Sequence, residues 1–222
     1  MTKPTRWSYS SISTYESCPA KWKFSYIDGL PYKPSAAMER GTRLHSDCER
    51  YVKGELQVMP WELNKVALRL EDLRMKKAQA EAVWLLDQDW ANTIRTPWIK
   101  AIIDVHWLES DGTVLQLRDY KSGREYPDHR SQLELYAVIG LCTFPEVKRA
   151  EYGAIYLDTG HVSNEGSVLR GDMLDKKRED WNNRAIRIFA DNDYNPNPNP
   201  NPGGACSRCD YSKAKGGPCV AA

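Results

Sequence analysis

Two apolar runs near the middle of the chain flank a turn signal, within the stretch Ala101–Gly123. Asp111-Gly112, between them, is a pair that favours a two-residue hairpin loop. Ile99, Ala101, Ile103, Val105 and Trp107 alternate along the first run and predict one apolar strand face. The pattern therefore predicts a β-hairpin whose strands belong to a protein core.

The rest of the chain alternates between helical spacing and short apolar runs. Residues 10–31 predict two short helices, capped by Ser10 or Ser11 and with Pro19 in the second. Apolar positions at helical intervals predict helices over 38–55, 62–79, 128–144 and 172–192, and apolar runs predict strands at 80–87 and 151–160. This order indicates a mixed α/β sheet flanked by helices.

The low-complexity stretch NPNPNPNPGG, residues 195–204, lacks apolar side chains and predicts a linker or strap. We therefore expect a core domain over residues 1–194, this linker, and a C-terminal segment over residues 205–222. That last segment carries three of the six cysteines.

Composition narrows the class of protein only slightly. The 222 residues are 41% hydrophobic with a net charge of +1, which neither favours nor excludes a nucleic-acid partner. Eight tryptophans and twelve tyrosines suit core packing better than base stacking. No apolar run approaches the ~20 residues of a membrane span, and the N-terminus lacks a signal core. We expect a cytoplasmic protein whose cysteines are buried thiols or metal ligands rather than disulfides.

Asp104 and Asp119 are unexpected in strands that otherwise resemble core. With Asp111-Gly112 as the loop, Ser110 pairs with Thr113, partner numbers sum to 223, and Asp104 lies opposite Asp119. Opposed residues have Cβ atoms about 4.5–5.5 Å apart, so two ionised carboxylates would repel each other. A divalent cation relieves that repulsion by taking an oxygen from each carboxylate.

Lys121 lies two residues after Asp119 and therefore points to the same sheet face. A lysine beside a metal-bound aspartate can orient a water or offset the charge of a phosphate. The alternative is an ordinary hairpin with an aspartate on each strand and a solvated lysine, because a single D-x-K pattern is short and common.

Further motifs occur in a fixed order around this pair. The sequence contains GTRLH with His45, IID with Asp104, DYK with Asp119 and Lys121, and QLELY with Gln132 and Tyr136. Together these resemble the RecB-like branch of the PD-(D/E)XK nuclease superfamily, which includes CRISPR-associated and phage exonucleases. The chain departs from that pattern at Ala101, where a glycine is usual nearby.

The resemblance implies a restriction-endonuclease-like sheet with a metal-dependent DNA nuclease site. Mg²⁺ or Mn²⁺ would be held by His45, Asp104, Asp119 and the backbone carbonyl of Tyr120. Asp104, Asp119, Lys121, Gln132 and Tyr136 would form the catalytic set. It further implies an exonuclease acting on single-stranded or frayed DNA ends, in recombination, repair or phage replication, inside a prokaryotic or phage-infected cell.

Four cysteines form a second candidate site. Cys206 and Cys209 form a C-x-x-C pair, Cys219 follows after a gap of nine residues, and Cys18 is distant in sequence. Four thiolates can hold zinc or an iron–sulfur cluster, and spacing alone leaves both open. The resemblance favours [4Fe-4S], which would join the N- and C-terminal segments. Cys48 and Cys142 fit buried positions in helices.

Several residues keep open interpretations. Glu81 is either a further acidic ligand or a strand-edge surface residue. Basic side chains near the site are either phosphate contacts or a solvated face: Arg118, Arg124, His129 and Arg130. Two other functions remain open for the whole chain, a nucleic-acid-binding module that does not cleave and a zinc-stabilised interaction protein.

Overall fold

A computed structural model describes residues 3–198 and 204–221 of the chain. It divides the chain into two compact units, Ser35–Arg178 and the pair of segments Met1–Pro34 and Glu179–Ala222. The division falls inside helix α6, Leu174–Ala190. Residues 199–203 of the predicted linker lie outside the described residues, and the described helices include none long and apolar enough to cross a membrane.

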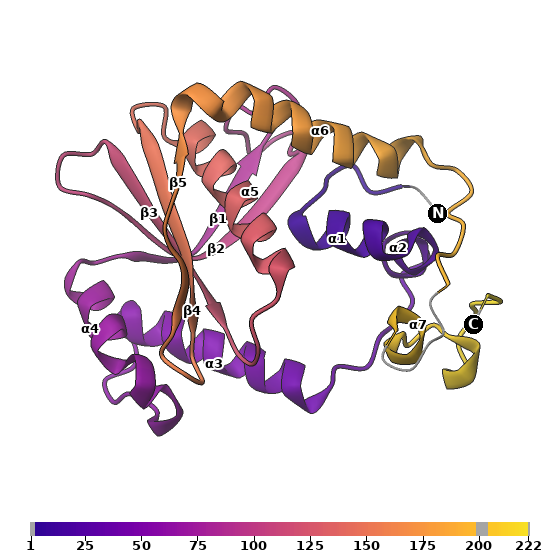
Figure 1. Cartoon of the computed structure of the whole chain (residues 1–222), viewed down its shortest axis with the longest axis horizontal. Helices are drawn as coiled ribbons and strands as arrows, with labels where there is room; N and C mark the ends of the chain where they lie inside the picture. The colour runs from indigo at the N-terminus through magenta and orange to yellow at the C-terminus, as the bar shows by residue number, and fades with distance from the viewer. Residues whose placement is uncertain (1–2, 199–203, 222) are drawn as a thin grey trace. The chain divides into compact units, whose positions relative to one another are not determined.

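The larger unit is built on one five-stranded sheet in the order β1-β2-β3-β4-β5 (Figure 1). Its strands are β1 (Gln79–Leu86), β2 (Ile99–Leu108), β3 (Val114–Lys121), β4 (Arg149–Tyr156) and β5 (Val162–Arg170). Strands β3 and β4 run parallel, and the other neighbouring pairs run antiparallel. Helix α5, Pro127–Thr143, connects the parallel pair, as parallel strands require a crossover. The predicted mixed sheet flanked by helices is confirmed.

Helices α3 (Ala36–Val52) and α4 (Ala67–Met75) share an apolar cluster with the sheet. Leu44 and Cys48 of α3 and Leu70 of α4 are fully buried there beside Val105. The single helix predicted over 62–79 is wrong, because a 3₁₀ helix, η1 (Trp61–Val66), precedes α4. A second short 3₁₀ helix, η2 (Gly171–Met173), leads into α6.

The hairpin keeps the predicted register with a different loop. Val105 pairs with Arg118 and Leu108 with Leu115, so partner numbers sum to 223 as expected. The loop is longer than two residues, because Glu109 donates its N–H to Val114 and accepts the N–H of Gly112. Gly112 has φ +69°, a backbone conformation that favours glycine. The ladder ends at Val105 and Arg118, so the predicted direct pairing of Asp104 with Asp119 is not formed.

The smaller unit contains α1 (Tyr9–Ser17), α2 (Pro19–Tyr26), most of α6, α7 (Ala205–Arg208) and η3 (Lys213–Lys215). Ser8, rather than Ser10 or Ser11, caps α1 by accepting the N–H of Ser11. Trp22 is fully buried and stacks on Tyr194 with ring centroids 5.4 Å apart. Trp22 and Tyr194 therefore serve the packing of this unit, as composition indicated.

Candidate active site

Asp104 lies where strands β2 and β3 stop pairing. The ladder ends at Val105 and Arg118, and the Asp104 carboxylate accepts the backbone N–H of Tyr120 at 2.6 Å. The residue is 9% exposed. One carboxylate oxygen thus occupies the position of a backbone partner at the point where the strands separate.

Asp119 is 3% exposed, and its Oδ2 lies 2.7 Å from Nζ of Lys121. Beyond this ion pair, Oδ2 has no hydrogen bond of ordinary geometry to the residues that the structure describes. Burial and the charge of Asp104 raise the pKa of Asp119 to about 6, against the lowering effect of Lys121. Asp119 is therefore a buried acidic group that lies within the electrostatic influence of a second one, Asp104.

Lys121 is held by a relay of side chains on α5. Its Nζ donates to Oε1 of Gln132 at 2.8 Å, and Nε2 of Gln132 donates to the Tyr136 hydroxyl at 2.8 Å. Gln132 and Tyr136 lie one helical turn apart on the same face. Because an ammonium group only donates, the amide oxygen of Gln132 must face Lys121.

His45 reaches the site from α3, and its Nδ1 lies 3.3 Å from Oδ2 of Asp104. Burial lowers the pKa of His45, but hydrogen bonding and the charge of Asp104 outweigh it, and the pKa is raised overall. Gly41, one turn earlier, permits the close approach of the helix, because a Cβ there would lie 3.0 Å from Oγ of Ser122.

Glu81 lies on β1 between two residues whose partners flank Asp104, since Ala80 pairs with Val105 and Ala82 with Ile103. Its φ of +53° is uncommon and strained for a residue other than glycine. Burial and then the charge of Asp104 raise the pKa of its carboxyl group. Glu81 is thus a strained residue whose carboxyl group feels the charge of Asp104.

The chemistry of these side chains fits Mg²⁺ or Mn²⁺, which take carboxylate oxygens and accept imidazole. The observation that supports this fit is that Asp119 Oδ2 is buried and, among the described residues, has the Lys121 ion pair but no further hydrogen bond. Over residues 3–198 and 204–221, however, no three His, Cys, Asp or Glu side chains are arranged closely enough to hold a metal ion together. His45 and Asp104 meet directly, and Asp119 meets Lys121 instead.

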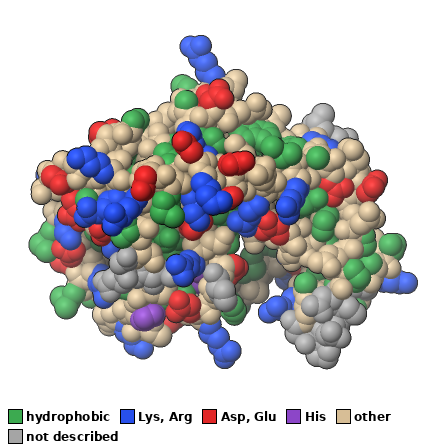
Figure 2. All heavy atoms as spheres, turned by 45° about the horizontal axis from the view of Figure 1, so that its top comes forward, with side chains coloured by type: hydrophobic (Ala, Val, Ile, Leu, Met, Phe, Trp, Pro, Cys, Tyr) green, Lys and Arg blue, Asp and Glu red, His purple; other side chains and the backbone are tan. Residues whose placement is uncertain are grey.

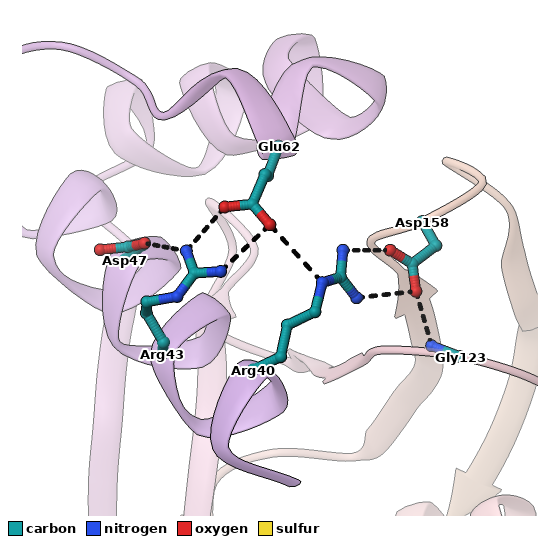
Figure 3. Close-up of polar contacts among 6 residues, drawn as sticks. All are labelled: Arg40, Arg43, Asp47, Glu62, Gly123 and Asp158. Carbon is teal, nitrogen blue, oxygen red and sulfur yellow. Dashed lines mark hydrogen bonds and ion pairs between the residues drawn. The ribbon is translucent and has the colours of Figure 1, made fainter. Parts of the chain in front are cut away.

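A network that sequence reasoning missed joins the helix of His45 to the loop after Lys121 (Figure 3). Arg40 of α3 binds Asp158 through two nitrogens, at 2.7 and 3.3 Å, and Asp158 also accepts the N–H of Gly123 at 2.8 Å. Glu62 of η1 binds Arg43 at 2.7 Å and lies 3.5 Å from Arg40. The only sequence signal was the position of Asp158, two residues after the end of a strand.

Arg118, considered as a phosphate contact, has other partners in the fold. It donates to the carbonyl of Leu117 at 2.7 Å and to Gln116 at 3.0 Å, and lies 5.3 Å from the Trp107 ring centroid. In the view of Figure 2, Lys and Arg side chains lie among Asp and Glu side chains and form no uninterrupted basic field.

The four cysteines of the second candidate site lie around one cavity of the smaller unit, but no three of these described side chains are arranged closely enough to hold a metal ion together. This cavity of about 300 Å³ is lined by four partly buried cysteines that form no disulfide: Cys18, Cys206, Cys209 and Cys219. Cys18 Sγ accepts the N–H of Asn197 at 3.4 Å. By contrast, Cys48 is fully buried in the larger unit, and burial raises the pKa of its thiol. The four cysteines thus belong to the smaller unit, whereas Cys48 is a core residue of the larger one.

The order of the strands and the acidic residues on β2 and β3 define the restriction-endonuclease-like class of α/β proteins. A family model described as the PD-(D/E)XK nuclease superfamily matches residues 6–214, and the chain belongs to that superfamily. Membership supports a nuclease, in a superfamily that generally uses Mg²⁺ or Mn²⁺.

Two solved structures align with this chain. SSO0001 aligns at a TM-score of 0.52 with 16% identity, covering 100% of this chain and 89% of the other. LHK-Exo in complex with dAMP aligns at a TM-score of 0.40 with 13% identity, covering 83% and 90%. No curated protein matches the sequence.

Proposed function

We propose that the protein is a divalent-metal-dependent DNA exonuclease that hydrolyses phosphodiester bonds at single-stranded or frayed ends. The observation that carries this proposal is two sets of contacts, one around each aspartate. His45 meets Asp104, Asp104 accepts the N–H of Tyr120, and Asp119 leads through Lys121 to Gln132 and Tyr136. In a PD-(D/E)XK superfamily member, these are the side chains that a cutting site needs.

In the proposed reaction, four residues of the site would hold the metal ion. His45, Asp104, Asp119 and the carbonyl of Tyr120 would hold Mg²⁺ or Mn²⁺. The cation, when bound, stabilises charge on phosphate oxygens and makes a water easier to deprotonate. Burial and the charge of Asp104 raise the pKa of Asp119, which would act as a ligand in its ionised form.

Lys121 supplies positive charge beside Asp119, where charge develops on the phosphate during in-line attack. Gln132 and Tyr136 position Lys121, because their hydrogen bonds limit the places that Nζ can occupy. A lysine without that support would lose side-chain order and part of its effect on the transition state.

We also propose that Cys18, Cys206, Cys209 and Cys219 hold a [4Fe-4S] cluster, with Zn²⁺ as the alternative. The support is that all four thiols line one cavity. The group would be structural, joining the N-terminal helices to residues 205–222, and hydrolysis needs no redox step. Iron content with broad absorption near ~400 nm would support the cluster, and a colourless protein with one zinc would replace it.

This proposal keeps the sequence-based organisation of a nuclease core over residues 1–194, a strap over 195–204 and a cysteine segment over 205–222. Recombination, repair or phage replication in the cytoplasm is the proposed setting. The competing functions are a nucleic-acid-binding module that does not cleave and a zinc-stabilised interaction protein, and neither has a use for the Lys121 relay.

Digestion of end-labelled linear DNA and closed circular DNA with Mg²⁺, Mn²⁺ or EDTA tests the proposal. We expect metal-dependent loss of linear DNA, faster for single strands, with circles left intact. Cutting of closed circles would exclude an exonuclease. Absence of cutting with either cation, together with retained DNA binding, would favour the binding module.

A further inference from the structure

Four aromatic rings form a continuous row beside the proposed active site. Tyr126 contacts His129 with ring centroids 5.5 Å apart, His129 contacts Tyr156 at 6.0 Å, and Tyr156 stacks on His161 at 6.0 Å. The last pair is nearly parallel, with an interplanar angle of 27°. We call these four residues the ring row.

The strand register places the ring row next to Lys121. Tyr156 of β4 is the direct parallel partner of Lys121 on β3. His129 precedes Gln132 by three residues on α5, so the two side chains share a helix face. The row therefore passes beside the lysine and the glutamine of the proposed active site.

The inner rings of the row are fixed and the outer rings are exposed. Tyr156 is 2% exposed, and its hydroxyl lies 2.7 Å from Nδ1 of His129 in a hydrogen bond. Tyr126 is 53% exposed, and the side chain of His161 is 59% exposed. The two inner rings, His129 and Tyr156, are held by their contacts within the fold. The two outer side chains, Tyr126 and His161, are mostly in water.

We propose that Tyr126 and His161 stack on unpaired nucleobases of the DNA strand whose phosphate lies at the active site. This inference rests on the proposed nuclease function and specifies its substrate. Aromatic faces bind any base, so the contact would be insensitive to sequence. A base that is already stacked and paired in a duplex cannot use these rings, so the row selects single-stranded or frayed ends.

A double-mutant cycle between ring and base tests the proposal. Binding of labelled single-stranded DNA is measured in the Asp119→Ala background with two oligonucleotides. One is intact, and the other lacks the bases of its terminal nucleotides at both ends. Tyr126→Ala and His161→Ala should each weaken binding of the intact strand by about 5- to 150-fold. The same variants should change binding of the abasic strand by less than about twofold.

Two further variants separate stacking from general damage. Tyr126→Phe keeps the ring and should retain the affinity for the intact strand. Trp61→Ala removes another aromatic residue of the same unit, 78% exposed, and should leave binding unchanged. Equal losses on intact and abasic strands, or a loss in Tyr126→Phe as large as in Tyr126→Ala, would overturn the proposal.

Cleavage by the unmutated protein distinguishes this inference from the function on which it rests. If that protein cuts DNA with Mg²⁺ while the ring variants bind intact and abasic strands alike, the nuclease assignment stands and the stacking proposal fails. If it neither cuts nor binds single-stranded DNA, both fail.

Discussion

Asp158 connects two parts of the proposed active site without belonging to it, which makes Asp158→Ala an informative perturbation. Its carboxylate binds Arg40 of the helix that carries His45 and the N–H of Gly123, two residues after Lys121. The side chains of Asp158 and Arg40 are 32% and 39% exposed, so their ion pair contributes about 0.5–1 kcal/mol after solvent screening. The hydrogen bond to Gly123 adds about 1 kcal/mol.

The two interactions together mean that Asp158→Ala should lower the free energy of unfolding by about 1.5–2 kcal/mol. Arg40 would still have a carboxylate partner in this variant, because Glu62 lies 3.5 Å from it. Arg40 also holds the pKa of Asp158 below its usual value of 3.8. Its stabilisation is present above that value and is lost as pH falls through the lower folded-state pKa. Urea unfolding at pH 7 and at pH 3 should show the difference between the two proteins shrinking at the lower pH.

The same variant should lower kcat by about tenfold with KM nearly unchanged, because the loop after Lys121 loses its anchor. Asp158→Asn, which keeps an acceptor for Gly123, should recover part of that loss. Asp72→Ala removes an exposed ion pair with Lys76 on α4 and is the matched control, with an effect below about 0.5 kcal/mol. A full kcat in a destabilised Asp158→Ala protein would refute the positioning argument.

Three further predictions concern His106, Gly140 and Gln132. Burial lowers the pKa of His106 to about 4, so at pH 4.5 this imidazole is protonated in the unfolded chain but mostly neutral in the folded protein. Between pH 7 and pH 4.5 the unmutated protein should therefore lose about 2.5 kcal/mol of unfolding free energy that His106→Leu does not lose. Urea unfolding at the two pH values measures this difference. A Cβ at Gly140 would lie 2.4 Å from Leu115, so Gly140→Ala should cost about 1–3 kcal/mol, and an unchanged melting temperature would contradict that packing. Gln132→Ala should reduce kcat about tenfold while leaving KM in place, and a rise in KM alone would assign Gln132 to substrate binding instead.

Much of the sheet was predictable because its strands are short apolar runs separated by strong turn residues. The register of β2 and β3 followed from the position of Asp111-Gly112 between the two runs, even though the loop has other hydrogen bonds. Strand β5 was missed. Its sequence, VSNEGSVLR, has few apolar residues and an internal glycine, and it gains its hydrogen bonds only by pairing with β4.

The side chains of the candidate site were predictable from motif order, but their contacts were not. No sequence pattern indicates that Asp104 accepts the N–H of Tyr120, because that depends on where two strands separate. The Arg40–Asp158 pair joins residues 118 positions apart and has no motif. The strain at Glu81 is equally invisible in the sequence, since glutamate usually avoids positive φ.

The most direct test of the central claim compares Asp119→Ala with the unmutated protein on end-labelled single-stranded DNA in Mg²⁺, with binding measured in parallel. Removing the buried carboxylate should abolish cleavage, by about a thousandfold or more, while DNA binding is retained. Cleavage by Asp119→Ala at the rate of the unmutated protein would show that the acidic pair of β2 and β3 is not where the phosphodiester bond is broken.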